Sequence, residues 1–249
     1  MILAQLSRLL GECQNIVAFL SPHFCVLCDC TSRNPFDLCP VCTDMLSENR
    51  HACAVCGLPM HASSPRVCGA CLTHPPPYSA TLACFQYSLP ADYFVCELKF
   101  SGKLVFGRLL GELMAREVMA RGVVLPEALV PVPLGADRLL GRGFNQSAEI
   151  AYACSRALVG PAVDTSLVRR VRDTHPQSQL KAIERRKNIR GAFSVAPRAA
   201  GYRHVALVDD VMTTGSTVAE IARRLRAAGV QRVDVWVAAR VGAEPDSIS

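Results

Sequence analysis

His204-Val-Ala-Leu-Val-Asp-Asp-Val-Met-Thr-Thr-Gly-Ser-Thr217 is the stretch that decides the fold of this chain. Val205–Val208 forms a short, continuous apolar run, which predicts a strand buried on both faces of a parallel sheet. Asp209 and Asp210 end that strand, so both acids are expected on the turn that leads into Thr213–Thr217. A helix is predicted next, because apolar residues then recur on one face, at Val218, Ile221, Ala222, Leu225 and Ala228.

The composition of this turn suits a phosphate group. Gly215 and the small hydroxyl residues around it let backbone N–H groups point inward at a helix N-terminus, where an anion is favoured. A phosphate alone does not need two acids beside it, but Asp209 and Asp210 can accept hydrogen bonds from vicinal hydroxyls or ligate a divalent metal. The turn therefore predicts a sugar phosphate ligand. The alternative is an ordinary strand–turn–helix unit with exposed acids.

Length and composition indicate a globular chain with a separate N-terminal module. The 249 residues leave room for one large domain, or for a core domain with a small one. Hydrophobic residues make up 50% of the chain and charged residues 19%, as in a protein with a packed core. Ten of the thirteen cysteines precede residue 72, and this asymmetry sets the N-terminal part apart.

Four Cys-x-x-Cys knuckles in the N-terminal part predict structural zinc. Each knuckle brings two thiolates to one ion, and gaps of ten and eleven residues let a second knuckle return as a hairpin. Sequential pairing gives a double zinc ribbon, but cross-braced pairing uses the same ligands and stays open. The predicted ligands are Cys25, Cys28, Cys39, Cys42, Cys53, Cys56, Cys68 and Cys71. Cys30 is close enough in sequence to compete for the first ion.

Residues 1–22 are expected to form an amphipathic helix that packs on the chain's own body. Apolar residues recur there at helical spacing, from Ile2 to Leu20. Docking to a membrane or a partner is the alternative. No unbroken apolar run approaches the length of about eighteen residues that a membrane span needs. The segment also lacks the basic n-region of a signal peptide. We therefore expect a cytoplasmic chain whose reduced cysteines are available to metal.

The proline-rich connector His74–Tyr78 predicts a domain boundary, with the double zinc ribbon over residues 23–76 and a larger domain over residues 77–249. Strands that alternate with helices in the larger domain predict a parallel α/β sheet, with ligands beyond the carboxyl ends of its strands. The predicted strands, besides the one at Val205, are Thr81–Tyr87, Ala128–Val132, Ala192–Val195 and Val233–Val237. The predicted helices are Pro90–Phe100, Gly107–Arg121 and one that ends near Leu158.

The positive charge of the chain is local. Ser166–Arg190 holds eight Lys and Arg residues against two acids, and its net charge of +6 equals the formal net charge of the whole chain. A loop of this kind suits a highly anionic ligand. The alternative is a solvated basic helix face.

Several blocks of sequence, in order along the chain, resemble one known family. They are Leu98-Lys-Phe-Ser-Gly-Lys103, Pro131-Val-Pro-Leu134, Arg142-Gly-Phe-Asn-Gln146, Arg169–Ser178, Arg185-Arg-Lys-Asn188, Gly191-Ala-Phe193 and the stretch from His204. Together with the cysteine knuckles, they are similar to the ComF/GntX family of competence proteins, over roughly residues 25 to 240. The resemblance implies a type I phosphoribosyltransferase-like parallel sheet flanked by helices, plus a small four-cysteine zinc-ribbon module.

The resemblance also implies a role for each part of the site. Asp209 and Asp210 would hold the ribose hydroxyls of phosphoribosyl pyrophosphate (PRPP), which binds with Mg²⁺. Pro131–Leu134, with Val132, Pro133 and Leu134, would form the pyrophosphate loop, and Arg169–Arg190 the mobile loop over the ligand. The catalytic candidates are Asp209, Asp210, Lys99, which would reach the pyrophosphate, and Arg172. The 5′-phosphate would be bound by Thr213, Thr214, Gly215, Ser216 and Thr217.

The function implied by the resemblance is transfer of a phosphoribosyl group from PRPP to an acceptor, with release of pyrophosphate, in the context of DNA uptake. Thr213 departs from relatives that act on purines, some of which have an acid there, and threonine cannot act as a base. The acceptor is therefore open. The sequence also leaves the oligomeric state open. The alternatives are a PRPP sensor without turnover, or an accessory protein that contacts single-stranded DNA or competence proteins.

Overall fold

The computed structural model describes residues 23–32, 34, 36–172 and 189–242. Two compact units divide the chain, one over residues 1–46 and the other over residues 47–249. The N-terminal helix expected over residues 1–22 lies outside the described residues, as does most of the basic segment. Within the described part, no helix combines the length and the apolar character that a membrane crossing requires.

The smaller unit is built around the first two knuckles. An antiparallel pair joins β1 (His23–Phe24) to β2 (Thr31–Ser32), and a short helix α2 (Pro40–Asp44) follows. Leu38 is completely buried, and few other large apolar side chains of this unit are. A segment with so little core depends on cross-links or metal for a fixed structure.

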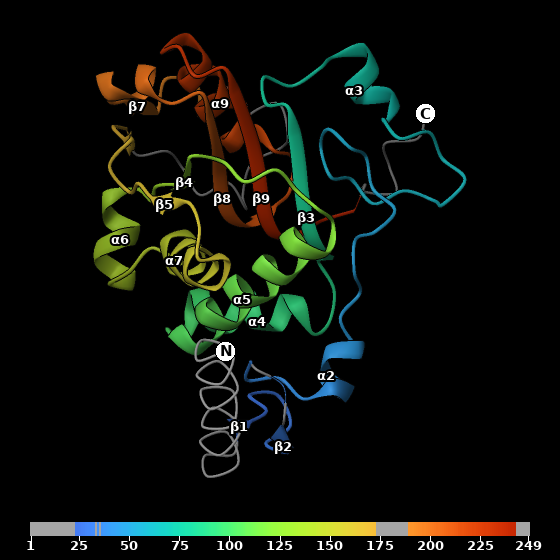
Figure 1. Cartoon of the computed structure of the whole chain (residues 1–249). Helices are drawn as coiled ribbons and strands as arrows, with labels where there is room; N and C mark the ends of the chain where they lie inside the picture. Colours follow the sequence, from blue (N-terminus) through green and yellow to red (C-terminus); the bar gives the residue numbers. More distant parts are fainter. Residues whose placement is uncertain (1–22, 33, 35, 173–188, 243–249) are drawn as a thin grey trace, which may run out of the picture. The chain divides into compact units, whose positions relative to one another are not determined.

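A five-stranded sheet is the centre of the larger unit (Figure 1), and its strand order is β3-β9-β8-β4-β5. Every neighbouring pair in this sheet is parallel, which confirms the predicted fold class. Its strands are β3 (Ala80–Gln86), β4 (Ala128–Pro131), β5 (Ala162–Val163), β8 (His204–Met212) and β9 (Arg232–Arg240).

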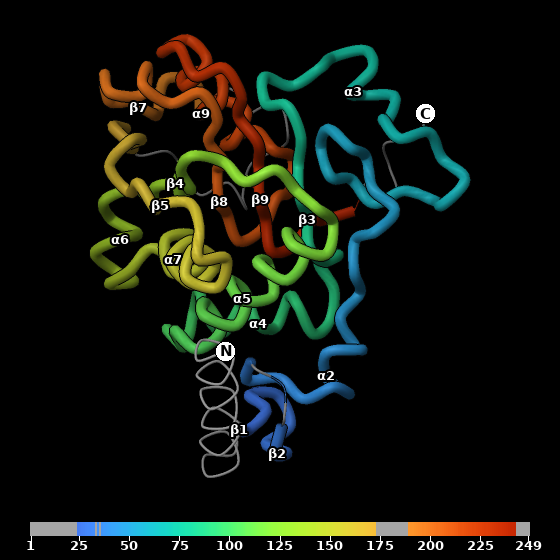
Figure 2. Tube along the Cα trace, in the orientation of Figure 1, coloured from blue at the N-terminus to red at the C-terminus, as the bar shows by residue number. Residues whose placement is uncertain are grey.

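Helices cover both faces of the sheet. Val205 and Leu207 of β8 pack in one apolar cluster with α9, while the alternate residues Ala206 and Val208 are equally buried on the other face. Figure 2 shows α5 and α7 side by side, and they approach so closely that a Cβ on Gly111 would meet Ala153 Cβ at 2.5 Å. The helices are α3 (Gly69–Thr73), α4 (Ala91–Phe100), α5 (Leu104–Ala120), α6 (Ala136–Arg142), α7 (Gln146–Leu158) and α9 (Ser216–Ala227), with the 3₁₀ turn η2 (Pro197–Gly201).

Two predictions about strands need correction. The strand predicted at Ala192–Val195 is present as β7 (Phe193–Val195), but it pairs antiparallel with β6 (Val168–Arg170) and lies outside the main sheet. The two-stranded ribbon β6–β7 thus closes the base of the basic segment. The strand β8 does not end at Asp209, because β9 pairs with it as far as Met212. Both acids therefore lie in the strand, not on the turn.

The second pair of knuckles belongs to the larger unit, where it packs beside the edge strand β3. Thr81 Oγ1 of β3 donates a hydrogen bond of 2.7 Å to the carbonyl of Val55, and Glu48 forms an antiparallel bridge with Phe85. Gly57 approaches β3 so closely that a Cβ would lie 2.9 Å from Thr81 Cγ2. The compact unit thus extends to the amino side of the proline-rich connector.

Candidate functional site

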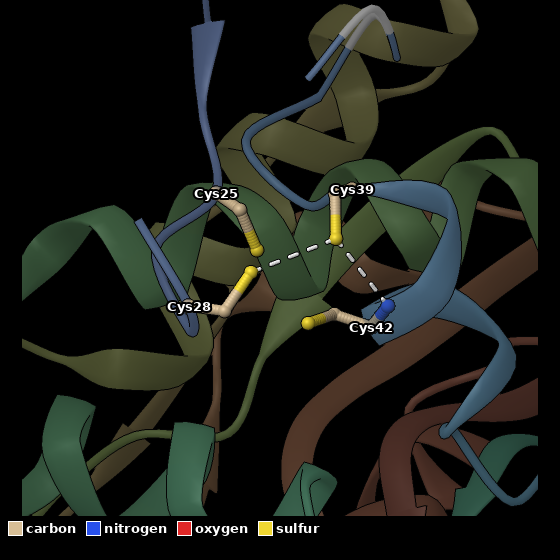
Figure 3. Close-up of side chains that lie close together, drawn as sticks. All are labelled: Cys25, Cys28, Cys39 and Cys42. Carbon is tan, nitrogen blue, oxygen red and sulfur yellow. Dashed lines mark hydrogen bonds between the residues drawn. The ribbon is translucent and has the colours of Figure 1, made fainter. Parts of the chain in front are cut away.

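The first four cysteines converge on one point within the smaller unit (Figure 3). Their sulfur atoms all lie within 4.8 Å of one another, and Cys28 Sγ is 3.7 Å from Cys39 Sγ. Cys39 caps α2, because its sulfur accepts the N–H of Cys42 at 3.5 Å. Cys30 is exposed and is not part of this group.

The second four cysteines form a matching group in the larger unit. Cys56 Sγ lies 3.7 Å from Cys68 Sγ, and the N–H of Cys68 donates to Cys53 Sγ at 3.3 Å. Cys71 completes the group. Each ion site is therefore built from two consecutive knuckles, so the pairing is sequential and not cross-braced.

Four sulfur ligands in each group suit a closed tetrahedral zinc site. Burial acts to raise the pKa of the Cys25 and Cys53 thiols, but backbone N–H donors outweigh it and lower the two pKa values to about 6 and about 7. Those donors come from Cys39, Leu27 and Cys28 at the first site, and from Cys56, Cys68 and Val55 at the second. The same N–H groups would orient the thiolates around an ion.

A second centre lies at the carboxyl end of β8, where the two carboxylates meet residues from other elements. Ser147 Oγ at the start of α7 donates to Asp209 Oδ1 at 2.9 Å, and the N–H of Asp210 donates to the same oxygen at 3.0 Å. Lys99 of α4 places its Nζ 2.9 Å from Asp210 Oδ2. The helices α4 and α7 and the strand β8 therefore converge here.

The charge balance of this centre favours a ligand that donates hydrogen bonds or carries positive charge. Burial and the neighbouring Asp210 carboxylate raise the pKa of Asp209 to about 7, against the lowering effects of Lys99 and Ser147. Asp210 is only 3% exposed, and the Nζ of Lys99, 2.9 Å away, is the partner of its Oδ2 atom among the described residues. Hydroxyl donors or a divalent cation would favour the ionised form of Asp209.

The predicted pyrophosphate loop lies directly beside these acids. The N–H of Val132 donates to the carbonyl of Val208 at 2.9 Å. Residues 132–134 therefore leave β4 beside Val208, the residue of β8 that precedes the two acids. Asn145, which caps α7 by accepting the N–H of Ser147, also donates to the carbonyl of Val132 at 3.1 Å. Pro133 and Leu134 are half-buried.

The turn Thr213–Thr217 leads from β8 into α9, and its form depends on Gly215. This residue has φ of 73° in the left-handed region, which favours glycine, and a Cβ there would lie 2.5 Å from Met212 Cε. Thr213 and Thr214 are exposed, and Thr214 Oγ1 is 2.8 Å from Ser216 Oγ. The first turn of a helix has N–H groups without partners inside the helix, so the turn can hold an anion.

Arg172 stands apart from this group, at the base of the basic segment. Its Nη2 donates to the carbonyl of Arg190 at 2.8 Å, across the gap between the described ends. Its catalytic role stays a prediction. The structure brings Asp209, Asp210, Lys99, Val132 and the turn Thr213–Thr217 together.

Four residues of the site have no role in the sequence analysis. Asn145 could have been recognised in the sequence, because an asparagine directly before a helical pattern is a typical N-cap. Ser147, Tyr78 and Arg240 carry none, because their contacts are made with residues far away in the sequence.

The fold and the two kinds of site define a class of protein: a phosphoribosyltransferase-like domain joined to zinc ribbons. Residues 16–72 match the double zinc ribbon domain, and residues 145–248 match the phosphoribosyl transferase domain. These matches agree with the two four-cysteine groups and with the position of the turn Thr213–Thr217.

Relatives that match over most of both chains define the family more narrowly than the two domain matches do. It is 38% identical to the DNA utilization protein YhgH of Salmonella typhimurium, over 88% of this chain and 97% of that protein. Identity is 37% to YhgH of Escherichia coli K12, with the same coverage, and 35% to competence protein F of Haemophilus influenzae, over 82% of this chain and 90% of that one. The chain belongs to the ComF/GntX family, as its sequence blocks predict.

The zinc assignment predicts a fixed metal content. Protein purified without chelators is expected to hold two zinc ions per chain, and Cys39→Ser is expected to hold one, because the first site then lacks a ligand. Cys30→Ser is the matched control and should keep both ions. Metal analysis by mass spectrometry measures the ratio; a zinc-free wild type, or a Cys30→Ser protein that has lost one ion, contradicts the assignment.

The raised pKa of Asp209 predicts a pH-dependent stability. An acid whose pKa is about 7 in the folded state, against about 3.9 unfolded, destabilises the fold progressively as pH rises from about 4 to 7. Asp209→Asn removes this cost, so its stability advantage over wild type should grow by about 2 kcal/mol between pH 5.5 and 8.

Thermal unfolding of the zinc-loaded proteins measures this difference. Asp164→Asn is the control, because Asp164, held by Arg198 at 2.7 Å, has a lowered pKa and stays ionised across this range. Its stability difference from wild type should be flat. A flat difference for Asp209→Asn as well would show that Asp209 is an ordinary ionised carboxylate.

Proposed function

We propose that this chain binds PRPP with Mg²⁺ and transfers its phosphoribosyl group to an acceptor, with release of pyrophosphate. The observation that carries the proposal is the adjacency of two carboxylates, at the end of β8, to a glycine turn at the start of α9. One part of this site suits vicinal hydroxyls and the other suits a phosphate. A ribose 5-phosphate carries both groups at a fixed separation.

The ribose end of the ligand would be held by Asp209 and Asp210. Their oxygens can accept hydrogen bonds from the 2′- and 3′-hydroxyls, and the ion pair of Asp210 Oδ2 with Lys99 leaves the carboxylates further lone pairs for this. Ser147 fixes the position of Asp209 from α7. Hydrogen bonds donated by the hydroxyls would favour the ionised form of Asp209.

The 5′-phosphate would lie against the turn Thr213–Thr217. Backbone N–H groups at the start of α9 and the hydroxyls of Thr213, Thr214 and Ser216 are its donors, and the helix dipole adds to the attraction. Gly215 supplies the left-handed φ of 73° on which the form of this turn depends.

The pyrophosphate would lie between the loop Val132–Leu134 and Lys99. Bound with the substrate, Mg²⁺ would neutralise charge on the leaving phosphates, and two carboxylates supply too few ligands for it, so phosphate oxygens and water would complete its shell. As the bond to pyrophosphate breaks, positive charge develops on the ribose ring. Asp209 and Asp210 are placed to stabilise that charge electrostatically.

The acceptor is a nucleophile that brings its own reactivity. Thr213 cannot remove a proton at neutral pH, and the turn Thr213–Thr217 itself contains no acid, histidine or lysine. We propose that this activity serves DNA uptake or use, since the relatives carry the names DNA utilization protein and competence protein F. The alternative is a sensor that binds PRPP at the same site but does not transfer the phosphoribosyl group, so that no pyrophosphate is released.

Binding of single-stranded DNA is a second candidate function, and one observation favours it. A cavity of about 570 Å³ opens at the amino ends of β3 and β9, away from the turn Thr213–Thr217. The side chains of His51, His61 and Arg66 line it, and among the described residues they have no hydrogen-bond or ion-pair partner. Such a basic cavity suits the phosphates of a nucleic acid strand.

The double variant Asp209→Asn with Asp210→Asn tests the principal proposal. It should lower the affinity for PRPP and Mg²⁺ by at least about 100-fold, because both hydroxyl acceptors lose their charge. Asp44→Asn in the other unit is the control and should bind as wild type does. Calorimetry measures affinity, and pyrophosphate release over a panel of bases and amines separates an enzyme from a sensor. Unchanged affinity of the double variant contradicts the site.

The salt dependence of single-strand affinity tests the second candidate. Contact with several phosphates should make the affinity fall steeply with salt, with a logarithmic slope of about −0.7 for each phosphate contacted. Arg66→Gln should make the slope shallower by about one such step, while Arg203→Gln, at an exposed site paired with Glu127, should leave it unchanged. A flat slope for the wild type excludes a strand bound through its phosphates.

A further inference from the structure

Arg240, the last residue of β9, is a buried arginine, and within the described part of the chain its side chain donates to backbone carbonyls alone. It is 6% exposed, and no carboxylate pairs with it among the described residues. Its Nε donates to the carbonyl of Cys56 at 3.1 Å, and its Nη1 donates to Met212 at 3.0 Å, to Val241 at 2.7 Å and to Thr213. A buried cation without a counter-ion is costly, so its retention calls for a physical reason.

The bonds from Arg240 hold two carbonyls at the start of the turn: that of Thr213, and that of Met212, which also accepts the N–H of Val241 at 3.1 Å. In a planar trans peptide, the C=O of one residue and the N–H of the next point in opposite directions. The carbonyls of Met212 and Thr213 face Arg240. The N–H groups of Thr213 and Thr214 therefore point away from it, and neither has a partner among the described residues.

The bond to Cys56 ties the same guanidinium to the second zinc ribbon. Cys56 is a member of the second four-cysteine group, and Val55 and Cys56 pack on the apolar cluster that contains Tyr78 and Met212. The Tyr78 hydroxyl lies 3.3 Å from the position of a Cβ on Gly215. The underside of the turn is thus built from the ribbon and the connector. All of these residues belong to the larger compact unit.

We propose that Arg240 is a positioning residue that aims the amides of Thr213 and Thr214 at the ligand and couples them to the second zinc site. This inference rests on the proposed function, because PRPP is the anion that those amides would bind. Zinc holds Cys56, Cys56 holds the guanidinium, and the guanidinium holds the two peptides. The positive charge of Arg240 also gains a nearby counter-charge when the phosphate arrives.

The coupling has a reciprocal consequence. If zinc at the second site raises the affinity for PRPP, then PRPP must raise the affinity for that zinc by the same factor. The first zinc site lies in the other compact unit. It therefore serves as an internal reference within each molecule.

The test begins with PRPP affinity in zinc-loaded protein, measured by calorimetry with Mg²⁺ present. Arg240→Lys keeps the charge but lacks the planar fork that reaches several carbonyls, and it should bind PRPP about 10- to 100-fold more weakly. Arg121→Lys is the matched control. Arg121 donates to the carbonyls of Asn49, Ala83 and Cys84 in the same unit but makes no bond to the turn, so its affinity should not change.

The second measurement follows zinc release to a coloured chelator, with and without PRPP. In the wild type, PRPP should slow the loss of one of the two ions several-fold, and in Arg240→Lys this protection should disappear. Cys39→Ser, which lacks the first site, should retain the protected ion. The wild-type part of this experiment needs no variant at Arg240, so a lack of protection overturns the inference even if Arg240→Lys fails to fold.

Each outcome has a distinct meaning. Wild-type protein that does not bind PRPP overturns the proposed function, and this inference falls with it. Wild-type binding that Arg240→Lys leaves unchanged overturns the inference alone, as does PRPP binding that protects neither ion. A loss of affinity in Arg121→Lys equal to that in Arg240→Lys would reduce the effect to general destabilisation.

Discussion

The full-length parallel pairing of β8 with β9 is the constraint on which the site depends. It runs from His204 opposite Arg232 to Met212 opposite Arg240, so the two strands end together. This shared end brings the acids of β8 and the guanidinium of β9 to the same edge of the sheet. A shorter pairing would release Asp209 and Asp210 onto a turn and separate Arg240 from the carbonyls it holds.

The second zinc ribbon extends this arrangement. Beside the edge strand β3 it contributes the carbonyl of Cys56 to Arg240 and packs Val55 on the core beneath the turn. An edge strand covered in this way is also protected from pairing with another chain. The ribbon is therefore part of the same compact unit as the sheet, although the proline-rich connector separates the two in the sequence. Metal that orders the ribbon would order the underside of the turn as well.

Local patterns predicted much of the fold and part of the site. The apolar run at Val205, the helical spacing after Val218 and the four knuckles each depend on neighbours in the sequence, and the structure contains all three. Local patterns cannot show which distant segment each element pairs with. The position at which β8 ends depends on its pairing with β9, and β7 lies outside the main sheet because it pairs with β6. The pairing of the zinc ligands depends on how the knuckles fold back on one another. Arg240 bonds to a residue 184 positions away, which no periodicity reveals.

Amide hydrogen exchange at residues 213–217 tests the central claim most directly, because that claim concerns N–H groups that point at a bound phosphate. Measured with and without PRPP and Mg²⁺, exchange at these amides should slow at least about 10-fold, while the amides of α6 should exchange at their original rates. Exchange at residues 213–217 that saturating PRPP leaves unchanged would contradict the account, since the phosphate would then be bound elsewhere or not at all.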